Sequence, residues 1–284
     1  MIDAVLDALI DSAKLLPFLF VTYLLMEYIE DKIEDKARAV LKKAGCVGPV
    51  WGALLGVIPQ CGFSAAASNL YAGRIITMGT LIAIYLSTSD EMLPIFISEA
   101  VSPTIILKIL CTKIIIGMCI GFIVDIVFTK LLKKKEQEMD IHHFCEHEHC
   151  ACGQGILKPA IKHTLQIFLF VFIITLILNI VVEAVGLQRI SDSVLNRPFI
   201  GEIIAGLIGL IPNCGASVMI SSLYIKGVIS FGTMMSGLLV GSGVGIMILL
   251  KVNGDRAQNA TVISILFVSG VLCGILINLL GIAV

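Results

Sequence analysis

The chain has 284 residues, of which 57% are hydrophobic and only 14% carry a charge. A soluble protein carries about 25% charged residues, so this composition excludes an ordinary soluble domain. The formal net charge of -1 gives no basis for binding nucleic acid. We therefore expect an all-α polytopic membrane protein whose principal partner is the lipid bilayer.

Residues 1–12 predict an amphipathic helix, either a solvated lead-in to the first hydrophobic segment or a helix on the membrane surface. Asp3, Asp7 and Asp11 recur at helical spacing, opposite a row of aliphatic residues. The segment has no basic leader, so we expect no cleavable signal peptide.

Hydrophobic segments fill the rest of the chain, apart from a charged linker at residues 130–162. A first membrane repeat, residues 13–129, contains four of them, at 13–29, 47–72, 75–97 and 104–129. A second membrane repeat, residues 163–284, contains four more, at 163–185, 199–224, 228–250 and 258–283.

The two halves share a motif at an offset of 153 residues. The stretch LLGVIPQCGFSAAASNLY, residues 54–71, aligns without a gap on LIGLIPNCGASVMISSLY, residues 207–224. Apolar composition alone would not align proline, cysteine, glycine and tyrosine together, so we interpret the match as an internal repeat. The same offset aligns two pairs of small residues that favour close helix packing, namely Gly117 and Gly121 with Gly270 and Gly274.

Basic residues predict the topology, because lysine and arginine accumulate on the cytoplasmic side. Segment 30–43 carries five lysines and arginines and the linker 130–162 carries six lysines, yet three full crossings between them would place them on opposite sides. The conflict disappears if 47–72 is a re-entrant hairpin, broken at Pro59, that enters and leaves on one side. The N-terminus is then outside and the linker cytoplasmic. The repeats are inverted, and the eight segments make ten spans if each hairpin counts as two.

Inverted repeats with broken helices are typical of secondary transporters. The sequence contains no Walker motif, so the chain has no site of its own for hydrolysing ATP. We therefore expect a secondary active transporter that works by alternating access, and no enzymatic activity.

Each predicted hairpin tip carries a thiol, a carboxamide and backbone groups that proline leaves unpaired. The predicted substrate-binding residues are Pro59, Gln60, Cys61, Gly62, Ser64 and Asn69, and in the second half Pro212, Asn213, Cys214, Gly215 and Ser217. Thiolates prefer soft partners such as Cu(I), Zn(II) and trivalent arsenic, so two facing cysteines predict a soft metal or metalloid site. The alternative is that each motif only breaks a helix and buries a small cysteine.

Two adjacent carboxylates, Asp90 and Glu91, lie in the third segment and align with Gly243 and Val244 of the second half. Carboxylates inside a membrane are costly and often functional, so we predict that they couple ions, as proton carriers or as ligands of a divalent cation. The alternative places them at the outer surface.

For Lys108 and Lys113 we expect anchoring at the membrane interface.

The linker contains a cluster of metal-binding side chains, His142, His143, Cys145, His147, His149, Cys150 and Cys152. Imidazole and thiolate bind Zn(II), Ni(II) and copper, but the spacing is not that of a zinc finger. We predict a flexible chelating or regulatory loop. No cofactor is required, and a metal ion enters as substrate or as a ligand of this loop.

The chain resembles a known family through the stretch GVIPQCGFSAAASNLYAGRIITMGTLIAIYLSTSDEMLP, its second copy GLIPNCGASVMISSLYIKGVISFGTMMSG and the His/Cys-rich loop. This is the family of ten-span heavy-metal exporters, related to organoarsenical permeases, whose members are also described as manganese transporters. The resemblance extends over essentially the whole chain. It implies an inner-membrane efflux permease and a small inorganic or organometal(loid) substrate. Apart from the resemblance, a homodimer is one arrangement compatible with the sequence.

Several functions remain compatible with these residues. Export of an arsenical or another soft metal would depend on Cys61 and Cys214, whereas export of a divalent cation such as manganese would depend on Asp90 and Glu91. Transport of a small sulfur-containing anion would use the positive N-terminal ends of the hairpin helices. A membrane metal sensor would need only the loop at residues 142–152.

Overall fold

The computed structural model describes residues 47–58, 61–89, 92–128, 199–212 and 214–282, with isolated positions between 16 and 24 and between 161 and 176. Within this part of the chain every regular element is a helix, which confirms the all-α fold class. The helix predicted at residues 1–12 and the linker 130–162 lie outside the described residues.

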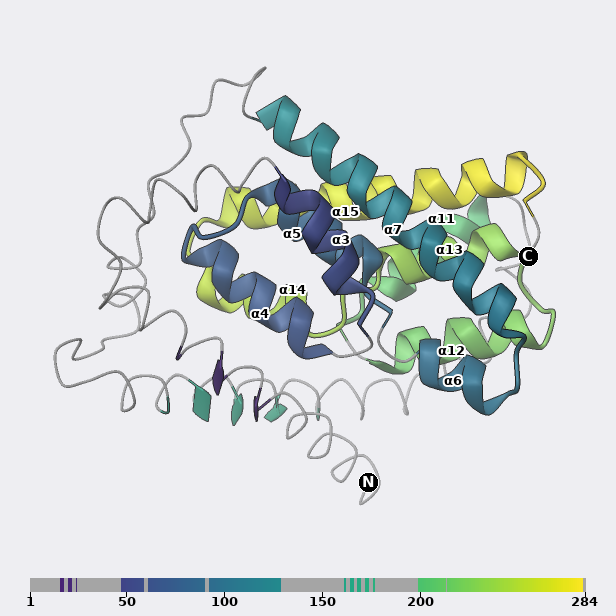
Figure 1. Cartoon of the computed structure of the whole chain (residues 1–284), viewed down its shortest axis with the longest axis horizontal. Coiled ribbons are helices and arrows are strands. Elements are labelled where there is room, and N and C mark those ends of the chain that lie inside the picture. The colour runs from purple at the N-terminus through teal and green to yellow at the C-terminus, as the bar shows by residue number, and fades with distance from the viewer. Residues whose placement is uncertain are drawn as a thin grey trace, which may run out of the picture.

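The two halves contain the same succession of helices (Figure 1). The first half comprises α3 (Gly48–Gly56), α4 (Cys61–Ala72), α5 (Met78–Ser87), α6 (Met92–Ser98) and α7 (Pro103–Ile126). The second comprises α11 (Ile200–Gly209), α12 (Cys214–Ile225), α13 (Phe231–Val240), α14 (Gly245–Val252) and α15 (Arg256–Leu279). From α4 and α12 onward, equivalent helices begin 153 residues apart, as at Cys61 and Cys214. The sequence repeat is therefore also a repeat of helices.

The second segment of each half is divided where the sequence predicts a break. α3 ends at Gly56 and α4 begins at Cys61, while α11 ends at Gly209 and α12 begins at Cys214. A proline at the break has no N–H to continue the hydrogen-bond ladder, and its ring clashes with the preceding turn. The return of each divided segment to the same side of a membrane stays a prediction.

The third segment of each half is also divided, contrary to the continuous spans expected at 75–97 and 228–250. α5 ends at Ser87 and α6 begins at Met92, and α13 ends at Val240 before α14 begins at Gly245. Thr88 leaves the helix with ψ near 129°, and Gly243 has a φ of +55°, a conformation that favours glycine. Within the described residues, each half therefore has two broken segments.

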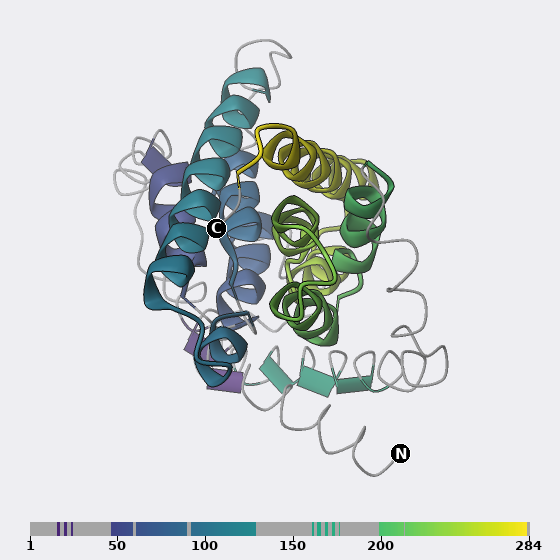
Figure 2. The same ribbon diagram turned by 90° about the vertical axis from the view of Figure 1, so that its right-hand side faces the viewer.

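The helices α5 and α13 form the centre of the molecule, and all residues from 79 to 87 and from 231 to 240 are buried. α5 packs against α3 and α7, and α13 packs in the same way against α11 and α15. Between the halves, α4 packs against α14 and α12 against α6. Figure 2 shows the first half, blue to teal, beside the second half, green to yellow. Each divided second segment thus packs against the divided third segment of the other half.

Glycines permit the closest helix contacts at equivalent places in both halves. A Cβ atom on Gly79 would clash with the backbone oxygen of Gly121, and one on Gly232 would clash with that of Gly274. Gly121 and Gly274 belong to the small-residue pairs identified in the sequence. These pairs therefore bring α7 and α15 close to the central helices.

The long outer helices α7 and α15 present aliphatic side chains outward, including Leu107, Ile115, Ile123, Leu272 and Leu276. Among the described residues, four apolar stretches are long enough to cross a membrane, namely Met78–Ser98, Pro103–Ile126, Phe231–Val252 and Arg256–Leu279. In Figure 1, α7 runs from right to left and α15 from left to right, as an inverted repeat requires. The chain is therefore a multi-pass membrane protein, while its inversion across the bilayer stays a prediction.

Candidate functional site

The four helix breaks lie next to one another. In the first half, a Cβ atom on Gly56 would clash with the Ser87 side chain, so the end of α3 touches the end of α5. In the second half, Gly209 approaches Gly237 and Gly241 in the same way. The halves meet where a Cβ atom on Gly245, the first residue of α14, would lie 2.9 Å from the Ser64 Cβ atom. Irregular backbone at membrane depth is tolerated where it lines a cavity or is buried in protein, so we take this region as the candidate site.

Ser68 is at the centre of a buried hydrogen-bond network in this region. Its Oγ atom lies 2.7 Å from the Ser64 carbonyl oxygen, 2.7 Å from the Tyr85 hydroxyl and 2.8 Å from the Gly245 carbonyl oxygen. The side chains of Ser64, Ser68 and Tyr85 are fully buried. The network joins α4 and α5 of the first half to the start of α14 in the second.

The structure locates six of the predicted substrate-binding residues. Gly62, Ser64 and Asn69 are buried in α4, within three turns of the break. Ser217, in the first turn of α12, would be 3.5 Å from a Cβ atom on Gly241. Pro212 is partly buried, and Gly215 is exposed. On α4, therefore, Ser64 lies at the contact between the halves, where it meets Gly245.

The other predicted site residues lie outside the described part of the chain. These are Pro59, Gln60, Asn213, Asp90, Glu91 and all seven members of the metal-binding loop, His142, His143, Cys145, His147, His149, Cys150 and Cys152. For Cys61 and Cys214 the structure describes only the backbone, and each is the first residue of the helix that follows a break.

Two buried hydroxyl groups of the second half have no hydrogen-bond partner within the described structure. They belong to Ser221, in α12, and to Ser242, in the break between α13 and α14. Buried polar groups are nearly always paired, so an unpaired one needs an explanation such as a bound molecule or water. Ser242 lies in the break that Ser217 approaches, so part of the candidate site can accept further hydrogen bonds.

The position of Lys113 differs from the interfacial anchoring expected for it. The side chain is fully buried near the middle of α7, and its Nζ atom donates hydrogen bonds to the carbonyl oxygens of Thr88 and Leu238. Lys108, one and a half turns earlier, is exposed. Sequence position alone did not show which face of α7 would pack against the ends of α5 and α13.

Polar groups at the site are concentrated in the first half. The residues equivalent to Tyr85 and Lys113 are Leu238 and Leu266, just as Gly243 is equivalent to Asp90. The comparison of the two repeats that identified Asp90 would have identified Tyr85 and Lys113 too, since each replaces an apolar residue. The second half thus provides mainly backbone carbonyls, small residues and hydroxyls, and the first half provides the ionisable groups.

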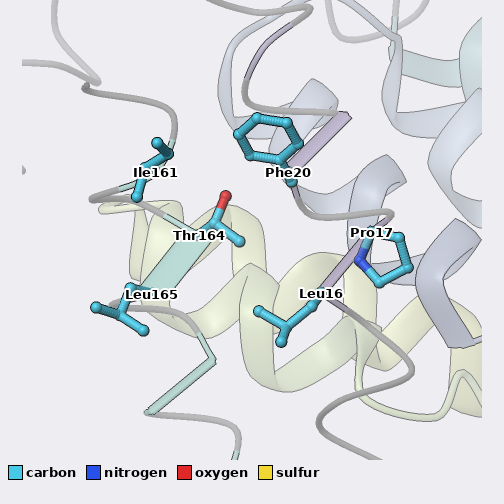
Figure 3. Close-up of a pocket in the computed structure, with 6 residues that line it drawn as sticks. All are labelled: Leu16, Pro17, Phe20, Ile161, Thr164 and Leu165. Carbon is cyan, nitrogen blue, oxygen red and sulfur yellow. The ribbon is translucent and has the colours of Figure 1, made fainter. Parts of the chain in front are cut away.

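No three His, Cys, Asp or Glu side chains within the described residues come close enough to hold a metal ion. A separate pocket of about 330 Å³ lies between the first and fifth predicted segments (Figure 3). Its lining is almost entirely apolar and consists of Leu16, Pro17, Phe20, Ile161, Thr164 and Leu165. None of these six described residues is a predicted site residue, and none has a His, Cys, Asp or Glu side chain.

A protein-family model described as "Putative, 10TM heavy-metal exporter" matches residues 1–188 and, in a second match, residues 163–283. No curated protein and no solved structure matches the chain. The second match begins where the second membrane repeat begins, and the two together extend over nearly the whole sequence. The chain therefore belongs to this family of ten-span heavy-metal exporters.

Proposed function

We propose that the protein is a secondary active transporter that exports a soft heavy metal or metalloid of the arsenical type by alternating access. One observation carries the proposal: the same Pro-x-Cys-Gly motif precedes and opens both α4 and α12, in a member of a family named for heavy-metal export. Two cysteines at equivalent breaks would supply soft ligands to a substrate between the halves.

The surroundings of the breaks support this site. α4 and α12 each pack against the other half, so a change in the contact between halves would change access to both motifs. The neighbouring hydroxyls of Ser221 and Ser242 have no partner in the described structure and could bind oxygen atoms of a hydrated or hydroxylated substrate.

Asp90 and Glu91 are proposed as the ion-coupling groups. They follow the end of α5 directly, in the break that Thr88 begins. Carboxylates at such a place could exchange protons during transport. For the loop at residues 142–152 we propose a chelating or regulatory role on the cytoplasmic side.

A second candidate function is transport of a small sulfur-containing anion. It is favoured by the meeting of two helix N-termini, where Ser64 of α4 contacts Gly245 of α14, because helix N-termini attract negative charge. The buried ammonium of Lys113 adds a positive charge to the first half of the site.

The test is uptake into everted membrane vesicles of arsenite, Cd²⁺, Mn²⁺ and thiosulfate, each measured separately. For the wild type we expect uptake of arsenite or Cd²⁺. In the double variant Cys61→Ser/Cys214→Ser this uptake should be at least about tenfold slower, because serine is a poor ligand for soft metals. The matched control is Cys111→Ser/Cys119→Ser, which changes two exposed cysteines of α7 and should leave uptake unchanged.

Other outcomes discriminate between the candidate functions. Full uptake of every soft substrate by the Cys61→Ser/Cys214→Ser variant would refute the thiol site. Uptake of Mn²⁺ alone, lost in Asp90→Asn/Glu91→Gln, would identify a divalent cation exporter, and uptake of thiosulfate alone would identify an anion transporter. If deletion of residues 142–152 abolishes a metal response while no substrate is transported, the protein is a sensor.

A further inference from the structure

Lys113 is a charged side chain in the interior of a membrane protein. It lies near the middle of α7, and none of its surface is exposed. An ammonium group in such surroundings is costly unless hydrogen bonds and opposite charge compensate for the lost water. Its partners therefore indicate why the protein can keep a lysine there.

The described partners of the ammonium include two backbone carbonyl groups at helix ends. Thr88 is the residue that caps the C-terminus of α5, and Leu238 is in the last turn of α13, with its oxygen 3.0 Å from Nζ. Carbonyls in the last turn of a helix lack N–H donors from the helix itself and form the negative end of its dipole. The ammonium thus compensates two negative helix ends at once.

These helix ends belong to different halves of the molecule. α5 and α7 are part of the first repeat, whereas α13 is part of the second. In transporters made of two repeats, carbonyls at the ends of broken helices are the groups that coordinate a coupling cation such as Na⁺. Here the side chain of Lys113 supplies a positive charge at such a place.

The second half shows that packing does not require a lysine at this position. Leu266 is the equivalent residue of α15, and it is also fully buried. An aliphatic side chain therefore fills the corresponding place in the second half. The positive charge is specific to the first half, where α7 meets both helix ends.

We propose that Lys113 is a resident monovalent cation, whose ammonium occupies a carbonyl-lined site between the ends of α5 and α13 and ties the two halves together. An alkali ion at this place would have the same charge as the ammonium and the same oxygen ligands. The site therefore needs no alkali ion while the lysine is present. One consequence rests on the proposed transport function, namely that export proceeds without Na⁺.

Chemical rescue tests the site without any transport substrate. The Lys113→Ala variant lacks a group with the size, shape and charge of n-propylammonium. We expect added n-propylammonium to raise the midpoint of thermal unfolding of the purified variant saturably, by about 3 °C or more. The neutral analogue 1-propanol should not do so, and the wild type should respond to neither compound.

Leu266→Ala is the matched control, because it opens a space at the equivalent place on α15 where Leu266 makes no ammonium contact. No stabilisation of Lys113→Ala by n-propylammonium, or equal stabilisation of Leu266→Ala, would overturn the proposal. If Lys113→Ala does not fold, reductive methylation of the wild type decides, since Lys113 should be protected while the exposed Lys226 reacts. Methylation of Lys113 as fast as Lys226 would also overturn it.

The consequence for transport is tested separately, by vesicle uptake with choline in place of Na⁺. Equal uptake with choline and with Na⁺ is expected, and a requirement for Na⁺ would contradict a resident cation. If no substrate in the panel is transported, the proposed function fails, but the rescue experiment still reports on the Lys113 site.

Discussion

Equivalent residues of the two halves do not make equivalent interactions, as Ser68 and Ser221 show. Both are fully buried, in α4 and α12 respectively. The Ser68 hydroxyl contacts Tyr85 and the Gly245 carbonyl, whereas the Ser221 hydroxyl has no partner in the described structure. Tyr85 accounts for one of the contacts that Ser221 lacks, since the residue at its place in the second half is Leu238.

Removing these two hydroxyls should therefore have unequal effects on stability. We expect Ser68→Ala to cost about 1–3 kcal/mol of unfolding free energy, because it leaves the buried Tyr85 hydroxyl with one partner fewer. Ser221→Ala, the matched control, should be neutral or stabilising. The measurement is the midpoint of thermal unfolding in detergent. Adding Tyr85→Phe to Ser68→Ala should recover part of the loss, and equal destabilisation by both serine variants would contradict the assignment.

The central helices α5 and α13 begin with N-caps of the same geometry, but the charged side chain beside the cap differs between them. Thr77 and Ser230 are the N-cap residues, and each side chain accepts a hydrogen bond from the backbone N–H three residues later. A side chain of the long outer helix reinforces each cap, since Asp125 accepts from the Gly79 N–H and Asn278 from the Gly232 N–H. In the second half the negative charge is on Glu202 instead, whose Oε1 accepts from the Asn278 amide.

A change of charge should lower the stability of the protein strongly at the cap of α13 and only slightly at the cap of α5. Asn278→Asp would place a carboxylate oxygen against that of the buried Glu202, so we expect a loss of about 2 kcal/mol or more in unfolding free energy. Asp125→Asn keeps an acceptor for the Gly79 N–H, and the residue equivalent to Glu202 is Pro49, so its effect should be small. Thermal unfolding of both variants measures this. Failure of Glu202→Gln to rescue Asn278→Asp would contradict the explanation.

At the scale of the whole molecule, the two ends of the contact between halves differ in chemistry. At one end, Arg74 and Tyr71 both donate hydrogen bonds to the side-chain oxygen of Gln258, over 2.7 and 3.2 Å. Arg74 has a φ of 59°, a left-handed conformation that strains a residue with a side chain. The equivalent residue of the second half, Gly227, adopts this conformation without strain. At the other end, Phe96 stacks on Tyr224 with ring centroids 6.2 Å apart. The first end is thus held by polar bonds and the second by an aromatic contact.

Breaking the polar contact should open the interface from the Arg74 end. A hydrogen bond to a charged group contributes about 1.5–3 kcal/mol, and about 1.4 kcal/mol corresponds to a factor of ten in an equilibrium constant. We therefore expect Gln258→Leu to increase the fraction of molecules whose two halves are separated at this end by about tenfold or more. The measurement is the rate at which a hydrophilic maleimide labels Ser64→Cys, a fully buried position of α4, in a chain lacking the native cysteines. Ile105→Leu, at the equivalent position of α7, is the control and should not change the rate. Equal rates for the two variants would show that the contact does not hold this end closed.

The sequence by itself determined the class of protein, the repeat and the place of the first break in each half. These features follow from local causes: apolar composition, a motif copied at a fixed offset, and prolines that lack an N–H. The resemblance to the exporter family was also readable from the motifs, and the family match confirms it.

Only the tertiary structure decided which segments meet and which side chains that meeting buries. The break at Thr88 was not predicted, because serine and threonine are compatible with a continuous span while proline is not. The burial of Lys113 depends on the ends of α5 and α13, and Leu238 is 125 residues away along the chain. The hydrophobic pattern of a sequence describes the surface of a single helix. The environment of a charged side chain depends on the other helices that pack against that helix. Lys113 therefore looked like a membrane anchor in the sequence and proved to be an internal contact between the halves.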